Sequence, residues 1–324
     1  MTNKIHDKII KKLGIENLIE LLVNRLSFGE LHSLLLKIFE LKIVKKNYSD
    51  ILNEYQSNRF TKPSDIDPII QKKLELNIFS LLPREFKLVE LSPLAPLGTT
   101  SVLTNTHQNN VVSTIRNAEI AADNTNILAL ECAKRRIELF KKDKQNRQTI
   151  KLCSSQRLTR AQLFDNKNFS AHFNVIALCS AGKDEGNDNF EIFNIEEHIK
   201  FYIDILEKII DKNEITIINI KFFNYEEFDN SSIIGRVKNQ FNHLDYIKFK
   251  IENDSDFGKN YYTRLRFMIS IVNQNNQEFD YIDGGFTDWT RKLLSNKKER
   301  LLTSGIGTDY LLRTVKIKTS ANNK

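Results

Sequence analysis

Asn260-Tyr261-Tyr262-Thr263 is followed by an apolar run over residues 265–272 and then by Asp283-Gly284-Gly285-Phe286-Thr287-Asp288. Successive side chains leave a strand on opposite faces, so one of the two tyrosines can pack into a core while the other presents its ring and hydroxyl to a ligand. The Gly-Gly pair lets backbone approach closely where a side chain would clash. Together these segments predict a lined pocket; the alternative is an ordinary strand followed by a turn or a bulge.

The composition is that of an ordinary globular chain. Of 324 residues, 40% are hydrophobic and 27% are charged, which is enough to bury a sizeable core. The longest apolar runs fall far short of the roughly 20 residues that cross a bilayer, and the polar N-terminus lacks a signal-peptide core. We therefore expect a cytoplasmic protein without membrane contact. The net charge of +7 favours an anionic partner, although 41 acidic residues balance most of the 48 basic ones.

The cysteines and histidines predict neither a disulfide framework nor a metal site. Cys132, Cys153 and Cys179 are an odd number and contain no Cys-x-x-Cys pair, so we expect buried thiols. The six histidines show no i, i+4 pair and no His-Glu-x-x-His pattern, so their spacing gives no metal ligands.

The five prolines all lie between residues 63 and 96, which predicts a boundary between a helical N-terminal module, residues 1–60, and a mixed remainder, residues 61–324. In the first part, leucines recur at helical spacing, and Ser27 with Glu30 forms a capping box that should begin a helix. Such stripes more often form a core than an interaction surface. We interpret the module as a small helical cap, with dimerisation as one role for it.

The remainder predicts an α+β fold built on a largely antiparallel sheet, because many strands alternate irregularly with few crossover helices. A helix over residues 65–82 should be capped by Ser64 or Asp65 and end before Pro83. Strands are predicted at residues 87–91, 101–103, 149–152, 172–179, 215–222, 246–251, 265–272 and 279–282, and helices at 125–141, 195–211, 231–240, 288–294 and 309–313.

Asp123 and Thr125 lie at the entry of the predicted helix over residues 125–141. An aspartate at this place usually caps the helix, which stabilises it by about 1 kcal/mol. The alternative is a carboxylate held at the rim of a pocket, where it pairs with a ligand ammonium group. Both interpretations stay open on the sequence alone.

Arg157-Leu158-Thr159-Arg160-Ala161-Gln162 precedes a polar loop, residues 165–168, and an apolar strand. On such a hairpin Arg160 can offer a fork to phosphate oxygens, and Gln162 can reach the edge of a base. An Arg-x-x-Arg pattern on a strand is more often a surface feature that forms ion pairs.

In this order the segments resemble the catalytic core of class II aminoacyl-tRNA synthetases, specifically the histidyl branch, which includes the synthetase-like regulatory subunit of ATP phosphoribosyltransferase. The helix at 65–82 and the strand ending at Leu91-Ser92-Pro93 resemble the first motif, whose helix and strand form the dimer interface. Asp123-Asn124-Thr125 is similar to the Arg-Pro-Asp/Glu-x-Thr loop, whose acid holds the substrate α-amine. Arg160-Ala161-Gln162 is similar to the second motif's Arg-x-Glu, with Phe173 and Gly182 resembling the Phe and Gly of its returning strand.

Two further segments resemble the histidyl signatures. Gly258-Lys259-Asn260-Tyr261-Tyr262-Thr263 is similar to Arg-Gly-Leu-Asp-Tyr-Tyr-Thr, and Gly284-Gly285-Phe286-Thr287-Asp288 is similar to Gly-Gly-Arg-Tyr-Asp. The resemblance implies a homodimer that uses ATP and Mg²⁺. It assigns the nucleotide to Arg160, Gln162, Phe173 and Arg313, with Arg160 also acting in catalysis, and the substrate to Asp123, Thr125, Tyr261, Tyr262, Gly284 and Gly285.

The departures from the family pattern narrow what the resemblance implies. Phe257 and Phe286 stand where the histidyl enzymes carry arginines, and Gln162 replaces the second motif's glutamate. Arg313 follows Gly305 by eight positions, which does not fit the third motif, so Arg264 and Arg266 become candidates to supply the missing charge. The chain ends close to that motif, and we expect no anticodon-binding domain. Charging of tRNA with histidine is therefore not expected.

Two functions follow. The first is a stand-alone enzyme that binds ATP and an amino acid or related acid and forms an acyl adenylate. The second is a catalytically silent paralogue that acts as a regulatory or scaffold subunit of a partner enzyme. A weaker third interpretation is an RNA binder, whose affinity would fall steeply with salt.

Overall fold

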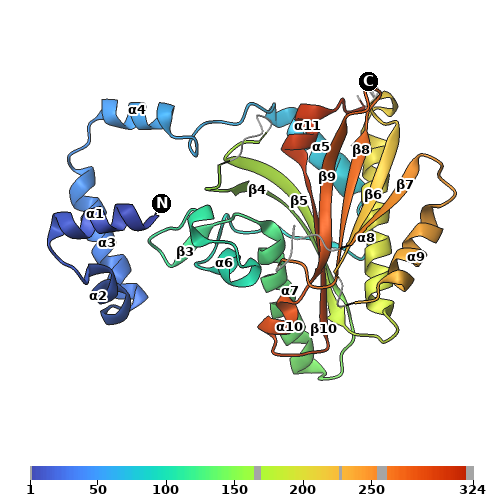
Figure 1. Cartoon of the computed structure of the whole chain (residues 1–324), viewed down its shortest axis with the longest axis horizontal. Helices are drawn as coiled ribbons and strands as arrows, with labels where there is room; N and C mark the ends of the chain where they lie inside the picture. Colours follow the sequence, from blue (N-terminus) through green and yellow to red (C-terminus); the bar gives the residue numbers. More distant parts are fainter. Residues whose placement is uncertain (1, 164–168, 226–227, 254–260, 319–324) are drawn as a thin grey trace.

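The computed structural model describes residues 2–163, 169–225, 228–253 and 261–318. Its first part is helical: α1 (Thr2–Leu13), α2 (Leu18–Arg25), α3 (Phe28–Ile43) and α4 (Tyr48–Ser57) stand apart from the sheet (Figure 1). The capping box predicted for the helix after Ser27 is confirmed, because the Ser27 hydroxyl accepts from the Glu30 backbone N–H and the Glu30 carboxylate accepts from the Ser27 N–H.

Eight strands of the described residues form one sheet in the order β1-β4-β5-β10-β9-β8-β6-β7. The pairs β1/β4 and β6/β7 are parallel and the five pairs between them are antiparallel, which confirms the predicted α+β fold with a largely antiparallel sheet. The strands are β1 (Lys87–Leu88), β4 (Ile150–Thr159), β5 (His172–Lys183), β6 (Ile217–Asn224), β7 (Ile247–Asn253), β8 (Leu265–Val272), β9 (Glu278–Thr287) and β10 (Glu299–Gly307).

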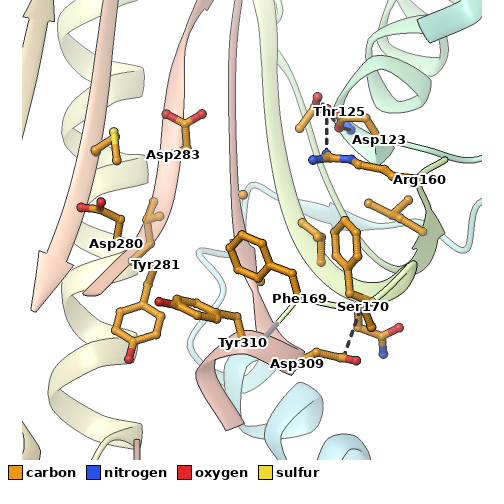
Figure 2. A pocket seen from close by; sticks show the side chains of 18 of the residues that line it. Asp123, Thr125, Arg160, Phe169, Ser170, Asp280, Tyr281, Asp283, Asp309 and Tyr310 are labelled. Atoms are coloured by element: carbon orange, nitrogen blue, oxygen red, sulfur yellow. Dashed lines mark hydrogen bonds and ion pairs between the residues drawn. The ribbon is translucent and has the colours of Figure 1, made fainter. Parts of the chain in front are cut away.

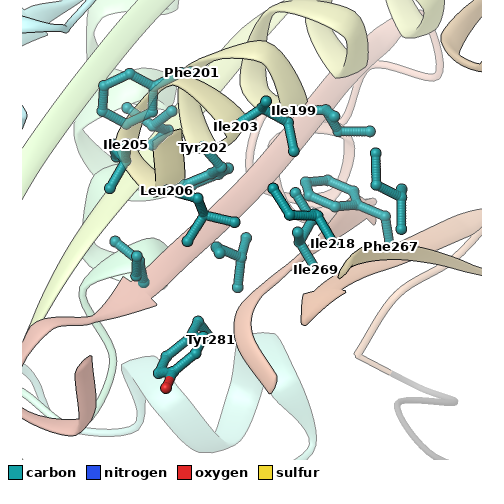
Figure 3. Packing of buried hydrophobic residues seen from close by; sticks show 14 of the residues in the cluster. Ile199, Phe201, Tyr202, Ile203, Ile205, Leu206, Ile218, Phe267, Ile269 and Tyr281 are labelled. Carbon is teal, nitrogen blue, oxygen red and sulfur yellow. The ribbon is translucent and has the colours of Figure 1, made fainter. Parts of the chain in front are cut away.

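Helices cover both faces of this sheet. On one face, α5 (Pro68–Ser80), α8 (Asn189–Ile209) and α9 (Ser231–Phe241) pack on the larger core, which includes Tyr202 and Leu206 of α8 together with Phe267 and Ile269 of β8 (Figure 3). On the other face, α6 (Thr99–Thr104), α7 (Asn124–Lys142) and α10 (Trp289–Leu293) enclose a smaller core. The second face is only partly covered, and its open part carries the cavity described below.

One predicted strand and one predicted helix cap are wrong. Residues 101–103 were expected to form a strand, but they belong to α6, because the Glu119 carboxylate accepts the backbone N–H groups of Gly98 and Thr100 at 2.8 Å and so caps a helix. Neither Ser64 nor Asp65 caps α5; Asp67 does, since its side chain accepts from Ile69 N–H and Pro68 occupies the first helical position. A small antiparallel pair, β2 (Leu94–Pro96) with β3 (Ala118–Ile120), carries Glu119 to this place.

The three cysteines are buried and form no disulfide, as expected. Burial raises the pKa of the Cys153 thiol to about 12, so it stays protonated and acts as a small apolar side chain. In the part of the chain that the structure describes, no helix is long and apolar enough to span a bilayer.

Candidate functional site

A cavity of about 370 Å³ lies on the open face of the sheet. It is bounded by the start of α7, by the β4–β5 hairpin, by β8, β9 and β10, and by α11 (Thr308–Thr314), as Figure 2 shows. Of the predicted site residues, Asp123, Thr125, Arg160, Phe173, Tyr261, Tyr262 and Arg313 line it. Segments far apart in the sequence thus converge at one place.

Asp123 caps α7 and also lines the cavity; its pairing with a ligand ammonium group stays a prediction. Its Oδ1 accepts from the backbone N–H of Thr125 at 2.9 Å and so caps α7. Its Oδ2 faces the cavity, where it accepts from the Tyr261 hydroxyl at 2.9 Å and lies 3.8 Å from Nη2 of Arg160. Burial, and next the Asp123 charge, raise the pKa of the Tyr261 hydroxyl well above its ordinary range. The hydroxyl therefore stays protonated and acts as the hydrogen-bond donor to the carboxylate.

The two tyrosines do not leave a strand on opposite faces, which corrects the expectation. They precede β8, which begins at Leu265, and both rings line the same cavity. Their centroids lie 4.7 Å apart in an edge-to-face contact, and the Tyr261 ring also packs edge-on against Trp289. The alternation rule fails here because residues 261–264 lie outside any described strand.

Arg160 follows the last residue of β4, and two contacts besides the ion pair with Asp123 hold its side chain. Its Nε donates to the carbonyl of Ala122 at 2.9 Å, and its guanidinium carbon lies 5.2 Å from the centroid of the Phe173 ring on β5. The β4–β5 register pairs Leu158 with Phe173, so the hairpin brings the arginine and the aromatic ring together. A fixed guanidinium beside an aromatic face suits a phosphate attached to a purine.

At the other end of the cavity, Arg266 and Asp283 form an ion pair, with Arg266 Nε 2.7 Å from Asp283 Oδ1. The Tyr262 hydroxyl donates to Asp283 Oδ2 at 3.0 Å. Almost half of the Asp283 side chain is solvent-accessible, and Asp283 lines the cavity. Burial by the surrounding protein raises the pKa of Asp283, against the opposing effect of Arg266.

Gly284 and Gly285 do not line the cavity; close packing requires them. A Cβ at Gly284 would lie 2.6 Å from the Phe267 ring and from Ser304, and a Cβ at Gly285 would lie 2.6 Å from the Tyr262 ring. Gly285 thus lets Tyr262 lie against the sheet. The predicted contact of the two glycines with a substrate has no support in this arrangement.

The remaining predicted residues have mixed placements. Arg313 lines the cavity and forms an ion pair with Asp65, whose pKa this contact lowers. Gln162 is exposed and lies outside the cavity wall; its carbonyl accepts from Arg59 at 3.1 Å. Arg264 pairs with Asp188 and Glu191, also away from the cavity.

Of the two arginine replacements, Phe286 packs in the larger core. Phe257 and the first half of the tyrosine signature, Gly258-Lys259-Asn260, lie outside the described residues, as does the polar loop over residues 165–168.

Several cavity residues were not predicted. Asp309 and Tyr310, at the start of α11, both line the cavity, and Asp309 Oδ1 accepts from the backbone N–H of Asn174 at 3.0 Å. The Tyr310 ring packs against Phe169 and Tyr281, each at 5.3 Å between centroids. A signal for one more was present in the sequence: Asp280 interrupts the run that forms β9, and aspartate is depleted in strands.

No group of three or more His, Cys, Asp or Glu side chains within the described ranges is arranged to hold a metal ion. The cavity wall nevertheless contains four carboxylates, on Asp123, Asp280, Asp283 and Asp309. A Mg²⁺ ion that arrives with a nucleotide is held mainly by phosphate oxygens and water. It needs only one or two protein carboxylates besides these ligands.

We compared the chain with family models, curated proteins and solved structures, and only solved structures match it. The sequence matches no family model and no curated protein. Among solved structures, apo histidyl-tRNA synthetase from S. aureus is similar with a TM-score of 0.57 and 14% identity, over 80% of this chain and 71% of that one. An ATP phosphoribosyltransferase regulatory subunit/histidyl-tRNA synthetase from Bacillus halodurans C has a TM-score of 0.53 and 14% identity, over 79% and 83%. Histidyl-tRNA synthetase from Nostoc sp. PCC 7120 gives 0.53 and 14%, over 78% and 74%. The chain therefore has the fold of the histidyl branch of the class II synthetases, as its motifs predicted.

Proposed function

We propose that the protein binds ATP and an amino acid or related acid in this cavity and joins them as an acyl adenylate. The observation that supports this most is the cluster around Asp123 at the cavity wall, where this carboxylate accepts a hydrogen bond from the phenol of Tyr261 and forms an ion pair with the guanidinium of Arg160. Such a cluster can hold the α-amine of an amino acid beside an α-phosphate, which brings the carboxylate of the acid close to the phosphorus that it attacks.

The reaction needs positioning more than acid–base chemistry. A carboxylate oxygen of the acid attacks the α-phosphorus of ATP; the new P–O bond forms as the bond to the bridging oxygen breaks, and pyrophosphate leaves. Arg160 would stabilise the charge that grows on the α-phosphoryl oxygens. The Tyr261 hydroxyl would orient the Asp123 carboxylate toward the substrate ammonium group, because it already donates to that carboxylate.

ATP with Mg²⁺ fits the residues on the Arg160 side. The Phe173 ring offers a face on which a purine can stack, and Arg160 offers charged N–H donors beside it. Mg²⁺ would neutralise part of the triphosphate charge close to the acidic side chains. Arg313 is a further cation of the lining.

The test is ATP–pyrophosphate exchange measured with a broad panel of amino acids and related acids. We expect one compound to stimulate exchange and Arg160→Ala to lower the rate at least 100-fold. Arg236→Ala is the matched control, since it removes the same charge from an exposed site on α9 that pairs with Glu196. No exchange with any compound, together with unchanged ATP affinity in Arg160→Ala, would refute the proposal.

A second function is favoured by the charges of the cavity. Among the described lining residues, four carboxylates face three guanidinium groups, and Arg266 and Arg313 already pair with acids. This balance suits an ammonium-bearing ligand better than an unaccompanied triphosphate. In this alternative, the protein is a catalytically silent paralogue that senses such a ligand and regulates a partner enzyme. The Bacillus halodurans protein is named as a regulatory subunit.

The two functions give different results in one pair of measurements. A silent subunit binds the acid without pyrophosphate exchange, and it co-purifies from its host in fixed stoichiometry with an enzyme whose activity the acid changes. An adenylating enzyme shows exchange as an isolated protein.

A further inference from the structure

The four N-terminal helices carry most of the uncovered apolar surface of the molecule. Eighteen of the 32 exposed large hydrophobic side chains in the described residues lie between Ile5 and Tyr55. Tyr48 is 96% exposed and Val44 is 80% exposed. None of the residues of α2, α3 and α4 is buried. This module, defined here as residues 2–57, therefore lacks a core of its own.

The longest helix of the module, α3, is apolar on more than one side. Leu34, Ile38 and Leu41 are exposed, as are Phe39 and Ile43 at neighbouring positions around the helix. A helix of this kind normally lies inside a protein. So many exposed apolar side chains within one short module are more than the scattered surface residues of an ordinary protein, and they favour an interaction site.

The amount of exposed apolar surface matches one side of a stable interface. Fully burying an aliphatic or aromatic side chain removes on the order of 100 Å² from water, so eighteen side chains that are about half exposed present roughly 900 Å². One partner of a standard interface contributes about 800 Å².

We infer that the module pairs with the same module of a second copy of the chain, so that α1–α4 of two copies form one shared helical core. A segment without its own core depends on association for its fold, and obligate interfaces of this kind resemble a domain core cut in half. The second copy is the partner that is present in equal amount wherever the chain is made. A two-fold arrangement also lets each apolar patch meet an identical patch.

The module is joined to the rest of the molecule by contacts that leave its apolar faces uncovered. Arg59 donates to the carbonyls of Ala161 and Gln162, and the His172 ring lies 2.6 Å from the carbonyl of Lys62. These polar contacts hold residues 59–62 against the β4–β5 hairpin. The helices themselves project beyond the sheet (Figure 1).

The test is the association of the full-length chain, measured by sedimentation equilibrium between 0.5 and 50 µM. We expect a dimer, and we expect Leu41→Lys/Leu52→Lys to weaken it at least tenfold, because both side chains are more than half exposed in the single chain. The matched control is Phe193→Lys on α8, which is 58% exposed and lies outside both the module and α5. It should associate like the parent chain.

Two outcomes would overturn the inference: a monomer throughout the concentration range, or a dimer equally tight in the double variant, which another face such as α5 and β1 would then hold.

Amide hydrogen exchange provides a second measurement without any substitution. Protection of residues 28–57 should fall at least tenfold on dilution from 50 to 0.5 µM, while that of α8 stays constant. Protection that does not depend on concentration would mean that the module folds back on its own chain. Neither result depends on activity in the cavity.

Discussion

Gly284 and its neighbour Gly285 lie in β9, where the space on either side is filled by other side chains. We expect Gly284→Ala to destabilise the fold by about 1–3 kcal/mol, because the added Cβ would meet the Phe267 ring and Ser304 at 2.6 Å inside a packed core. Urea unfolding measures the change. Gly235→Ala on α9 is the control: its Cβ would have no neighbour within 4 Å, and it should leave the stability equal or slightly higher. A loss as large as that of Gly284→Ala would show that the clash is not the cause.

The same glycines show what sequence can say about single residues. The Gly-Gly pattern correctly indicated a close approach, but side chains of the chain itself, not a ligand, occupy the space. Asp123 and Tyr261 were predicted because a polar residue at a helix start and a tyrosine beside a strand are visible in the sequence. That their oxygens lie 2.9 Å apart could not be predicted, since 138 positions separate them.

At the scale of elements, a buried ion pair fixes α7 to β10. Arg136 and Glu299 are both fully buried and share two hydrogen bonds of 3.0 Å. We expect Glu299→Gln to cost about 3–5 kcal/mol of unfolding free energy, because it leaves a guanidinium charge buried without its counterion. Arg136→Met/Glu299→Leu, which removes both charges, should regain at least half of that loss. An equal loss in the single and double variants, measured by urea unfolding, would contradict this. Glu40→Gln, in an exposed pair with Lys37, should change little.

A buried histidine joins α8 to the sheet and predicts an acid sensitivity. Burial, and next the Lys151 charge, lower the pKa of His198 to about 3, and its ring contacts Ser180 of β5 and Ser304 of β10. In the folded chain the His198 ring stays neutral down to about pH 3, whereas in the unfolded chain the same ring takes up a proton below about pH 6.5. The folding free energy that is fully present above pH 6.5 is therefore lost progressively as the pH falls toward 3.

The expected slope from this one group approaches about 1.4 kcal/mol per pH unit between pH 6 and 4. The measurement is unfolding free energy against pH for the parent chain, for His198→Gln and for His243→Gln, an exposed control. The first variant should lose this part of the slope, whatever its stability at pH 7.5, and the control should keep it. Identical slopes in all three chains would rule out His198 as the source.

The elements that were predicted and those that were not differ in a physical way. Runs with one polar face, such as β8, have a period that reveals them, and β8 has the predicted bounds. β10 was not predicted as a strand, because Thr303 and Ser304 are buried on its two sides and interrupt the apolar pattern. Ser304 is tolerated there because His198 and Tyr202 reach it from α8 at 2.8 Å, a contact that only the folded chain creates.

On the scale of the whole molecule, the order of motifs carried more information than any single motif. Each resemblance was loose, yet the segments around Asp123, Arg160 and Tyr261 meet at one cavity, because a shared fold preserves their relative places. The helical module was predicted as helices but not as exposed ones, since an apolar stripe is the same whether its partner belongs to its own chain or to another.

The cavity couples ligand binding to the stability of the whole molecule, and this gives a prediction that separates the two proposed functions. A ligand at 100 times its dissociation constant stabilises the folded chain by about 2.7 kcal/mol, which raises the melting temperature by roughly 5 °C for a chain of this size. For an adenylating enzyme, ATP with Mg²⁺ and the acid should each raise it, and Arg160→Ala should abolish only the ATP effect. For a silent paralogue, the acid alone should raise it. Asp123→Asn should abolish the acid effect in both cases, because it removes the carboxylate that faces the cavity. Shifts that survive both substitutions would place the ligands at another site.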